Sequence, residues 1–298
     1  MIRRVLFALV LLVGSVNALD FRYGKGSFDT DISIKYFMNH NIDYDINVFS
    51  LNEQHKTFSS YPLFFYYDAE LYMSDTQQED VDFANPMADI QMPIFGSMND
   101  MLDTFTGFFP VQGDYEALGF DFNFGVGYDL YRKGESFLGI AINSGASMPM
   151  MSAENLDDKG QLTFNMIDTF DLDISTYKLG PALKANFALN EKLSLYGNYS
   201  YGFQTATIES DLFKSSVDVD GSYSLLDIGL RLKPWKKRTT YGSISFSPKI
   251  TFALGHTNKS WEVDSVKVNL YGFRTNIFRP FTADYKSSYT YLSIGYSF

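Results

Sequence analysis

Three histidines are the side chains in this sequence best suited to acid–base or metal chemistry. They are His40, His55 and His256, and the chain has no cysteine to act as a nucleophile or a second kind of metal ligand. A serine hydrolase would need a Gly-x-Ser-x-Gly turn, a zinc protease a His-Glu-x-x-His helix, and a nucleotide site a glycine-rich phosphate loop. None of these motifs occurs in the sequence. We therefore assign no catalytic residue, no metal ligand and no cofactor.

One acidic segment, Asp218-Val219-Asp220-Gly221, superficially matches the start of a calcium-binding loop. Such a loop needs a bidentate glutamate further along to complete its shell of oxygen ligands, and the sequence lacks it. Two aspartates separated by one residue also lie on the same face of any strand. The segment therefore predicts no metal site.

Charged residues recur at every second position along many segments, with apolar residues between them. If these segments are strands, the charges share one face, because successive side chains of a strand point in opposite directions. Acids outnumber bases on this polar face, and the two signs are mixed. The face carries Asp43, Asp45, Asp68, Glu70, Asp121, Asp129, Lys178, Lys184, Asp227, Arg231 and Lys249.

The clearest strand pattern runs from Leu118 to Tyr131. Every second residue from Leu118 to Leu130 is Leu, Phe, Val or Tyr, while Gly, Asp and Asn fill the positions between them. The last strand, within Asp284 to Phe298, shows the same alternation up to the final residue. A chain end is normally frayed, so an apolar pattern that reaches it indicates a strand with a partner.

The composition favours a β-protein. Aromatic residues make up 17% of the chain, and 22 glycines accompany them. Strands favour aromatic residues, and barrel interiors and turns accommodate glycine. A net charge of −11 argues against nucleic acid as a partner, because such binding needs a basic surface. The absence of cysteine excludes a disulfide scaffold.

The N-terminus predicts export. Met1 to Ala18 begins with Arg3 and Arg4 and continues with an apolar run that is too short to span a membrane as a helix. We expect a signal peptide that is cleaved after Ala18, followed by one domain over residues 19–298. No cysteine follows that could carry a lipid anchor.

This signal peptide, together with the closing Tyr296-Ser297-Phe298, resembles those of Gram-negative outer-membrane β-barrel proteins. In that class the C-terminal phenylalanine helps to recruit the insertion machinery. The resemblance implies outer-membrane localisation, contact with outer-membrane lipid, and an insertion signal at Tyr296 and Phe298. It identifies no subfamily, and the oligomeric state stays open.

The predicted fold is an all-β transmembrane antiparallel up-and-down barrel of about ten strands, with twelve possible. Running the chain up and down places the long connections 75–116, 148–173, 205–222 and 255–283 outside the cell. It places the short connections 52–61, 132–135, 190–192 and 234–238 in the periplasm. One further outer connection, at Asn39 to Asn41, is predicted to be a short turn. A soluble β-sandwich is the alternative fold.

Three functions remain open for such a barrel. The first is a surface or structural barrel in which the interior charges pair and plug the lumen, or leave a narrow, weakly cation-preferring pore. The second is a substrate-specific channel lined by the polar face. The third is a hydrolase like the ten-stranded omptin proteases, which carry a histidine and acidic residues at the outer rim. His40 and His256 are expected at that rim, and His55 on the periplasmic side.

Overall fold

The computed structural model describes eleven segments of the chain, all of them strands or the turns between strands. These are residues 18–34, 38–57, 62–84, 108–157, 169–210, 215–235, 239–241, 244–246, 249–270, 273–276 and 281–297. The strands are β1 (Ala18–Ile34), β2 (Met38–Thr57), β3 (Leu63–Ser74), β4 (Gln77–Ala84), β5 (Phe108–Lys133), β6 (Ser136–Asp157), β7 (Thr169–Ala188), β8 (Leu193–Ser210), β9 (Ser215–Leu232), β10 (Thr239–Tyr241), β11 (Ile244–Phe246), β12 (Ile250–Leu270), β13 (Phe273–Asn276) and β14 (Phe281–Ser297).

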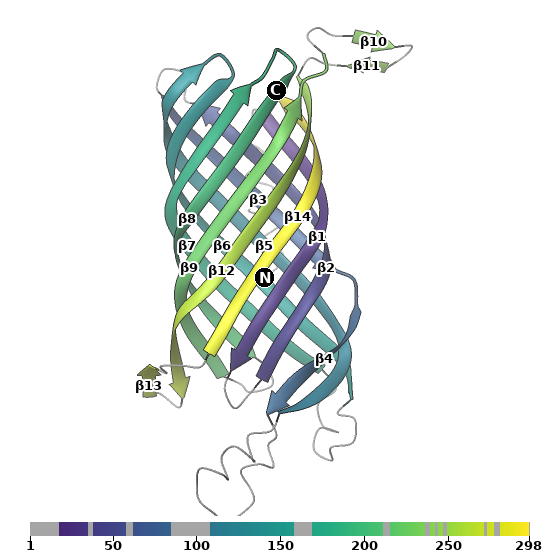
Figure 1. The fold of residues 1–298 in the computed structure, drawn as a ribbon, viewed down its shortest axis with the longest axis vertical. Helices are drawn as coiled ribbons and strands as arrows, with labels where there is room; N and C mark the ends of the chain where they lie inside the picture. The colour runs from purple at the N-terminus through teal and green to yellow at the C-terminus, as the bar shows by residue number, and fades with distance from the viewer. Residues whose placement is uncertain are drawn as a thin grey trace, which may run out of the picture.

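Ten of the described strands close into an antiparallel barrel (Figure 1). Around the ring their order is β1, β14, β12, β9, β8, β7, β6, β5, β3 and β2, and the pairing of β2 with β1 closes the circle. β4 follows β3 and pairs with the outer parts of β5 and β2. β13 folds back on the end of β12, and β10 and β11 form a separate small hairpin. The prediction of a ten-stranded barrel is confirmed.

Both ends of the described chain lie at one end of the barrel, because Ala18 in β1 pairs with Ser297 in β14. In outer-membrane barrels this end faces the periplasm and the other faces the cell exterior. The turn from β5 to β6 at the periplasmic end needs only Gly134 and Glu135, and Gly134 has a positive φ of 61° that favours glycine. The small β10–β11 hairpin also lies at this end (Figure 1).

The strands continue well into the segments predicted as outer loops. β4 and the start of β5 lie within 75–116, β6 and β7 shorten 148–173, β8 and β9 shorten 205–222, and β12, β13 and β14 occupy most of 255–283. The short turn predicted at Asn39 to Asn41 is also wrong, since β2 begins at Met38. Most strands therefore exceed the roughly 9–11 residues that cross a membrane. We call the part beyond the membrane the extracellular extension.

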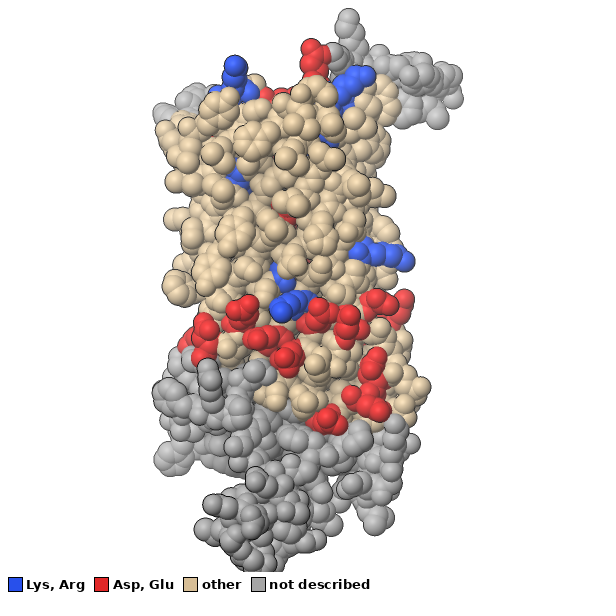
Figure 2. All heavy atoms as spheres, viewed as in Figure 1, with Lys and Arg blue, Asp and Glu red and all other residues tan. Residues whose placement is uncertain are grey.

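The outer surface has two zones. Nearer the periplasmic end, large apolar side chains face outward and are exposed, as lipid contact requires. This apolar band includes Phe21, Tyr23, Leu71, Phe124, Val126, Ile140, Ile142, Leu179, Leu183, Tyr199, Phe203, Ile228, Leu230, Leu254, Leu292 and Ile294. Toward the other end the outward residues turn acidic, and Figure 2 shows their carboxylates as a red band across the barrel.

The extracellular extension reverses the pattern of the apolar band. Its outward side chains are polar because they face water, and its inward side chains are apolar because they pack against one another. This core inside the barrel includes Phe28, Ile32, Ile42, Tyr44, Ile46, Val81, Val111, Tyr115, Met151, Leu172, Ile174, Ile208, Val219, Trp261 and Tyr285. The acidic, low-hydropathy segments were therefore strands of a filled barrel rather than loops.

Several features of the sequence lie outside the described residues. They include Met1–Asn17 of the predicted signal peptide, Phe298, and residues 85–107 between β4 and β5. In the described part of the chain, no helix is long and apolar enough to cross a membrane.

Candidate functional site

Eight charged side chains gather inside the barrel and form a charged layer. Four are basic and four are acidic, so the layer is balanced when all are ionised. The bases are Arg22, Lys178, Lys184 and Lys259, and the acids are Asp68, Glu70, Asp121 and Asp227. A buried charge is tolerated only when it is paired and hydrogen-bonded, so the geometry of the pairs decides what the layer does.

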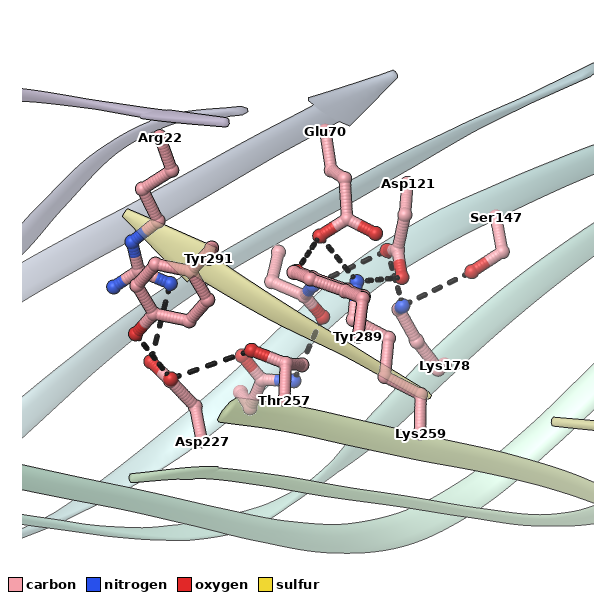
Figure 3. Close-up of polar contacts among 12 residues, drawn as sticks. Arg22, Glu70, Asp121, Ser147, Lys178, Asp227, Thr257, Lys259, Tyr289 and Tyr291 are labelled. Atoms are coloured by element: carbon pink, nitrogen blue, oxygen red, sulfur yellow. Dashed lines mark hydrogen bonds and ion pairs between the residues drawn. The ribbon is translucent and has the colours of Figure 1, made fainter. Parts of the chain in front are cut away.

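Lys259 makes the contact that spans the lumen (Figure 3). Its Nζ lies 2.9 Å from Asp121 Oδ2 and 2.8 Å from Glu70 Oε2, and its side chain is fully buried. Lys259 stands on β12 and Asp121 on β5, which are third and eighth in the ring order and thus five places apart among ten. The two strands are therefore on opposite sides of the barrel, and this ion pair crosses its diameter.

Two more side chains tie this centre to the wall. Lys178 Nζ lies 2.5 Å from Asp121 Oδ1 and donates to Ser147 Oγ at 3.0 Å. The Tyr289 hydroxyl donates to Glu70. Asp121 thus accepts from a lysine on each of its oxygens, and the centre joins strands β3, β5, β6, β7, β12 and β14.

A second centre lies around Asp227. Arg22 NH1 is 3.2 Å from Asp227 Oδ2, and the Tyr291 hydroxyl donates to Oδ1 at 2.6 Å. Thr257 Oγ1 also donates to Oδ1, at 3.3 Å, and the Arg22 guanidinium lies 4.3 Å from the centroid of the Tyr291 ring. This carboxylate therefore has donors from β1, β12 and β14, and Figure 3 shows it beside the first centre.

A chain of amides continues the network along the inner wall. Asn123 donates to Asp121 at 3.1 Å, Asn143 donates to Asn123 at 3.4 Å, and the Tyr66 hydroxyl donates to Asn143 at 2.9 Å. Lys184 Nζ lies 3.6 Å from the centroid of the Tyr66 ring. The cavity next to this wall has a volume of only about 30 Å³, which is far below that of a small-molecule site.

Most of the predicted interior residues lie inside the barrel. Seven of them, Asp68, Glu70, Asp121, Asp129, Lys178, Lys184 and Asp227, are inward-facing, and all but the half-buried Asp68 are buried. Asp129 and the half-buried Arg231 lie nearer the periplasmic mouth than the charged layer, Asp129 beside His55 and Arg231 bonded to Asp20 at 2.8 Å.

The prediction is wrong for Asp43, Asp45 and Lys249. Asp43 and Asp45 are exposed on the outer face of β2, because this part of the strand belongs to the extracellular extension. Asp43 pairs in register with Asp29, and a hydrogen bond between the two carboxyl groups, aided by partial burial, raises the pKa of Asp43 from 3.8 to about 6. Lys249 is exposed in the turn before β12.

Sequence reasoning missed two members of the charged layer. Arg22 lies in β1, for which the sequence analysis names no strand, and Lys259 lies in the part of β12 that falls within the predicted loop 255–283. A signal for Lys259 was present, since Gly255, Thr257, Lys259 and Trp261 alternate with outward-facing residues. The low hydropathy of these outward residues hid the strand.

The histidines do not assemble a rim site. His40 is fully buried in the extracellular extension, where its Nε2 lies 3.1 Å from the Tyr44 hydroxyl and burial lowers its pKa from 6.5 to about 4. His256 is exposed on the outer face of β12, within the wall rather than at the rim. His55 bonds Asp129 at 2.8 Å at the periplasmic end. Within the described ranges, no group of three or more potential metal ligands is found.

The fold matches solved outer-membrane barrels. The chain is similar to the outer membrane protease OmpT of Escherichia coli, with a TM-score of 0.54 and 8% identity over 95% of this chain and 98% of that one. The chain has the fold of a Gram-negative outer-membrane β-barrel. With its exposed apolar band, this barrel resides in the outer membrane and contacts lipid there.

Two other solved structures give weaker likenesses. The toluene transporter TodX of Pseudomonas putida has a TM-score of 0.32 and 11% identity, over 96% of this chain and 91% of that one. The β domain of the Bordetella autotransporter BrkA has a TM-score of 0.33 and 12% identity, over 95% and 100%. These scores carry no functional argument. No family model and no curated protein matches the sequence.

Proposed function

We propose that this outer-membrane barrel has a surface or structural role and that its lumen is plugged by its own side chains. The observation that carries the proposal is the ion pair of Lys259 with Asp121, which joins opposite walls of the barrel. A narrow, weakly cation-preferring pore and a substrate-specific channel both need a continuous water path through this level. When all eight groups are ionised, their charges balance and leave no surplus of one sign to attract a permeating ion.

The extracellular extension supports the same proposal. Beyond the charged layer the interior is filled by apolar side chains such as Trp261, which stacks on Tyr285 with ring centroids 4.6 Å apart. An interior packed in this way stabilises the strands outside the membrane and presents their acidic outer face to the surroundings. The barrel therefore serves as a rigid stem that holds an acidic surface above the lipid.

An omptin-like hydrolase gains no support from the described residues. Such an enzyme needs a histidine beside acidic groups at the outer rim, with room for substrate. His40 is buried in the extension, where its ring packs between Tyr44 and Tyr115 and has no acidic partner among the described residues. The likeness to OmpT is one of fold, and no catalytic residue is carried over from it.

The assembly of the barrel is a further part of the proposal. We propose that residues 1–18 direct export and are removed, and that the closing strand with Tyr296 and Phe298 engages the outer-membrane assembly machinery. Tyr296 supports this proposal because it is exposed on the outer face of β14. Replacing Tyr296 and Phe298 with serine should slow insertion in cells while leaving refolding in detergent intact.

Solute flux into vesicles tests the plugged lumen. Residues 19–298, refolded into lipid vesicles, should admit neither potassium ions nor a small sugar faster than protein-free vesicles do. Heat-modifiable migration on a gel confirms that the barrel has folded. A matched variant without residues 85–107 separates the outer connection from the plug, and it should be equally tight. Rapid flux through the folded wild-type barrel would contradict the proposal.

A further inference from the structure

The periplasmic mouth of the barrel contains a cavity that the charged layer does not use. Its volume is about 290 Å³, close to the size of small ligand pockets. Its walls include Asp20, Glu53, His55, Asn186 and Arg231. The ring of His55 stacks on Phe137 with centroids 3.7 Å apart and gives the cavity one aromatic wall.

Ion pairs account for the other charged groups of this wall. Arg231 bonds Asp20 at 2.8 Å, and Lys233 bonds Glu135 at 2.7 Å. Arg132 and His55 both face Asp129, which lies just behind the wall. Glu53 is the carboxylate of this wall that forms no close ion pair with a described residue, and Arg231 and Lys56 act on it only as more distant charges.

Glu53 is 8% exposed, and its Oε2 has no hydrogen-bond partner among the described residues. Asn186 is 6% exposed, and its Oδ1 is also without one, although its amide nitrogen donates to the Glu135 carbonyl at 2.7 Å. Both orphan atoms are acceptors. Leaving a buried acceptor unpaired is costly, so the partner that fits this cavity is a hydrogen-bond donor.

An irregularity in β2 aims Glu53 at the cavity. The pairing of β2 with β3 shifts register between Glu53 and Lys56, which is a β-bulge. As a result Asn52, Glu53 and His55 all line the cavity, which an uninterrupted alternation of side chains would not allow. Bulges are frequent at barrel rims, where they redirect a side chain. The direction of this carboxylate therefore follows from the local backbone.

We propose that the periplasmic cavity binds an organic ammonium group, with Glu53 as its counter-ion. An ammonium group brings three donors and one positive charge, which match the two orphan acceptors and the ionised carboxylate of Glu53. The stacked rings of His55 and Phe137 flank the carbon chain that carries the ammonium group. A small amine and the lysine side chain of a periplasmic protein present this same chemistry. The proposal stands whether or not the lumen conducts.

Titration of the refolded barrel in detergent micelles tests this site, with n-butylammonium chloride as the probe and n-butanol as its neutral match. Binding of the amine, with chemical-shift changes at His55 and Asn186 and no response to n-butanol, is the expected result. Glu53→Gln keeps the shape and removes the charge, and it should weaken binding by at least about tenfold. Glu191→Gln removes a charge from the β7–β8 turn at the same end and should change binding by less than about twofold.

A capped Gly-Lys-Gly peptide distinguishes the two sources of the ammonium group. If the peptide binds with the same dependence on Glu53, a lysine side chain of a protein fits the cavity. If only n-butylammonium binds, the site takes a free small amine. Equal binding of n-butanol, unchanged affinity in folded Glu53→Gln, or no binding up to about 50 mM amine would overturn the proposal.

Discussion

Replacing Lys259 with methionine should destabilise the barrel strongly. The fully buried ammonium group is shared by Asp121 and Glu70 at 2.9 and 2.8 Å. Without it Asp121 keeps Lys178, but Glu70 keeps only the Tyr289 hydroxyl. Removing one partner of a buried ion pair typically costs about 3–5 kcal/mol, since the remaining charge is left uncompensated. We expect a loss of that size in the free energy of unfolding.

A second substitution tests whether charge balance is the cause. Lys259→Met combined with Glu70→Gln leaves three bases and three acids in the charged layer. We expect the double variant to recover at least about 1 kcal/mol of the loss. Lys286→Met removes an exposed lysine from the neighbouring β14 and should stay within about 0.5 kcal/mol of wild type.

Denaturant unfolding in lipid or detergent measures these effects, with Trp261 fluorescence as the local probe. Its ring stacks on Tyr285 close to the charged layer. Two results would refute the reasoning. One is a loss below about 1 kcal/mol for Lys259→Met, and the other is a double variant less stable than the single one.

Three further predictions concern the extracellular extension and the apolar band. NMR titration should find His40 neutral down to about pH 4. Because His40 of the unfolded chain takes up a proton near pH 6.5, the free energy of unfolding should fall by roughly 3 kcal/mol as the pH drops from 6.5 to about 4. A measured His40 pKa near 6.5 would contradict this prediction. The raised pKa of Asp43 means that this carboxylate binds a proton more readily in the folded barrel than in the unfolded chain. The ionised carboxylate therefore lowers the stability of the fold at neutral pH, and this loss of stability disappears as the pH falls from about 6 to 3.8. Asp43→Asn should therefore stabilise at pH 7 by less than about 1 kcal/mol, with no gain near pH 4, and a loss at pH 7 would show that Asp29 does not repel it. Ile142→Lys in the apolar band should lower the free energy of unfolding in lipid by about 2–4 kcal/mol, whereas Asp171→Lys on the extension should change it by less than about 0.5 kcal/mol. Equal effects would show that the membrane boundary does not lie between these two residues.

The sequence predicted the part of the fold that lies in lipid. Between Leu118 and Leu130 the outward side chains are apolar and the inward ones small or polar, which is the alternation expected of a barrel strand in lipid. The two acids of this segment, Asp121 and Asp129, are buried in the structure.

The same rule failed outside the membrane, where water replaces lipid. Ile42 and Asp43 alternate as clearly as residues of β5, but in the extension the apolar residue faces inward and the acid outward. Alternation fixes which residues share a face, and the surrounding medium decides which face is inside. Nothing in the local pattern of β2 distinguishes the two media.

The charged layer and the periplasmic cavity depend on long-range geometry. Lys259 and Asp121 are 138 residues apart and meet because β12 and β5 face each other across the ring. Predicting pairs of that kind requires knowledge of the ring order and of the tilt of every strand. The direction of the Glu53 side chain depends on a bulge that shifts the register of β2 against β3 by one residue. Hydrophobic periodicity in the sequence does not reveal a shift of one residue.

Single-channel recording in planar bilayers tests the plugged lumen most directly. Residues 19–298, inserted as a heat-modifiable folded barrel, should give no conductance steps in potassium chloride across the range of applied voltage. Stable, cation-favouring steps from the wild-type barrel would contradict the account, because they require a continuous water path past the contact of Lys259 with Asp121.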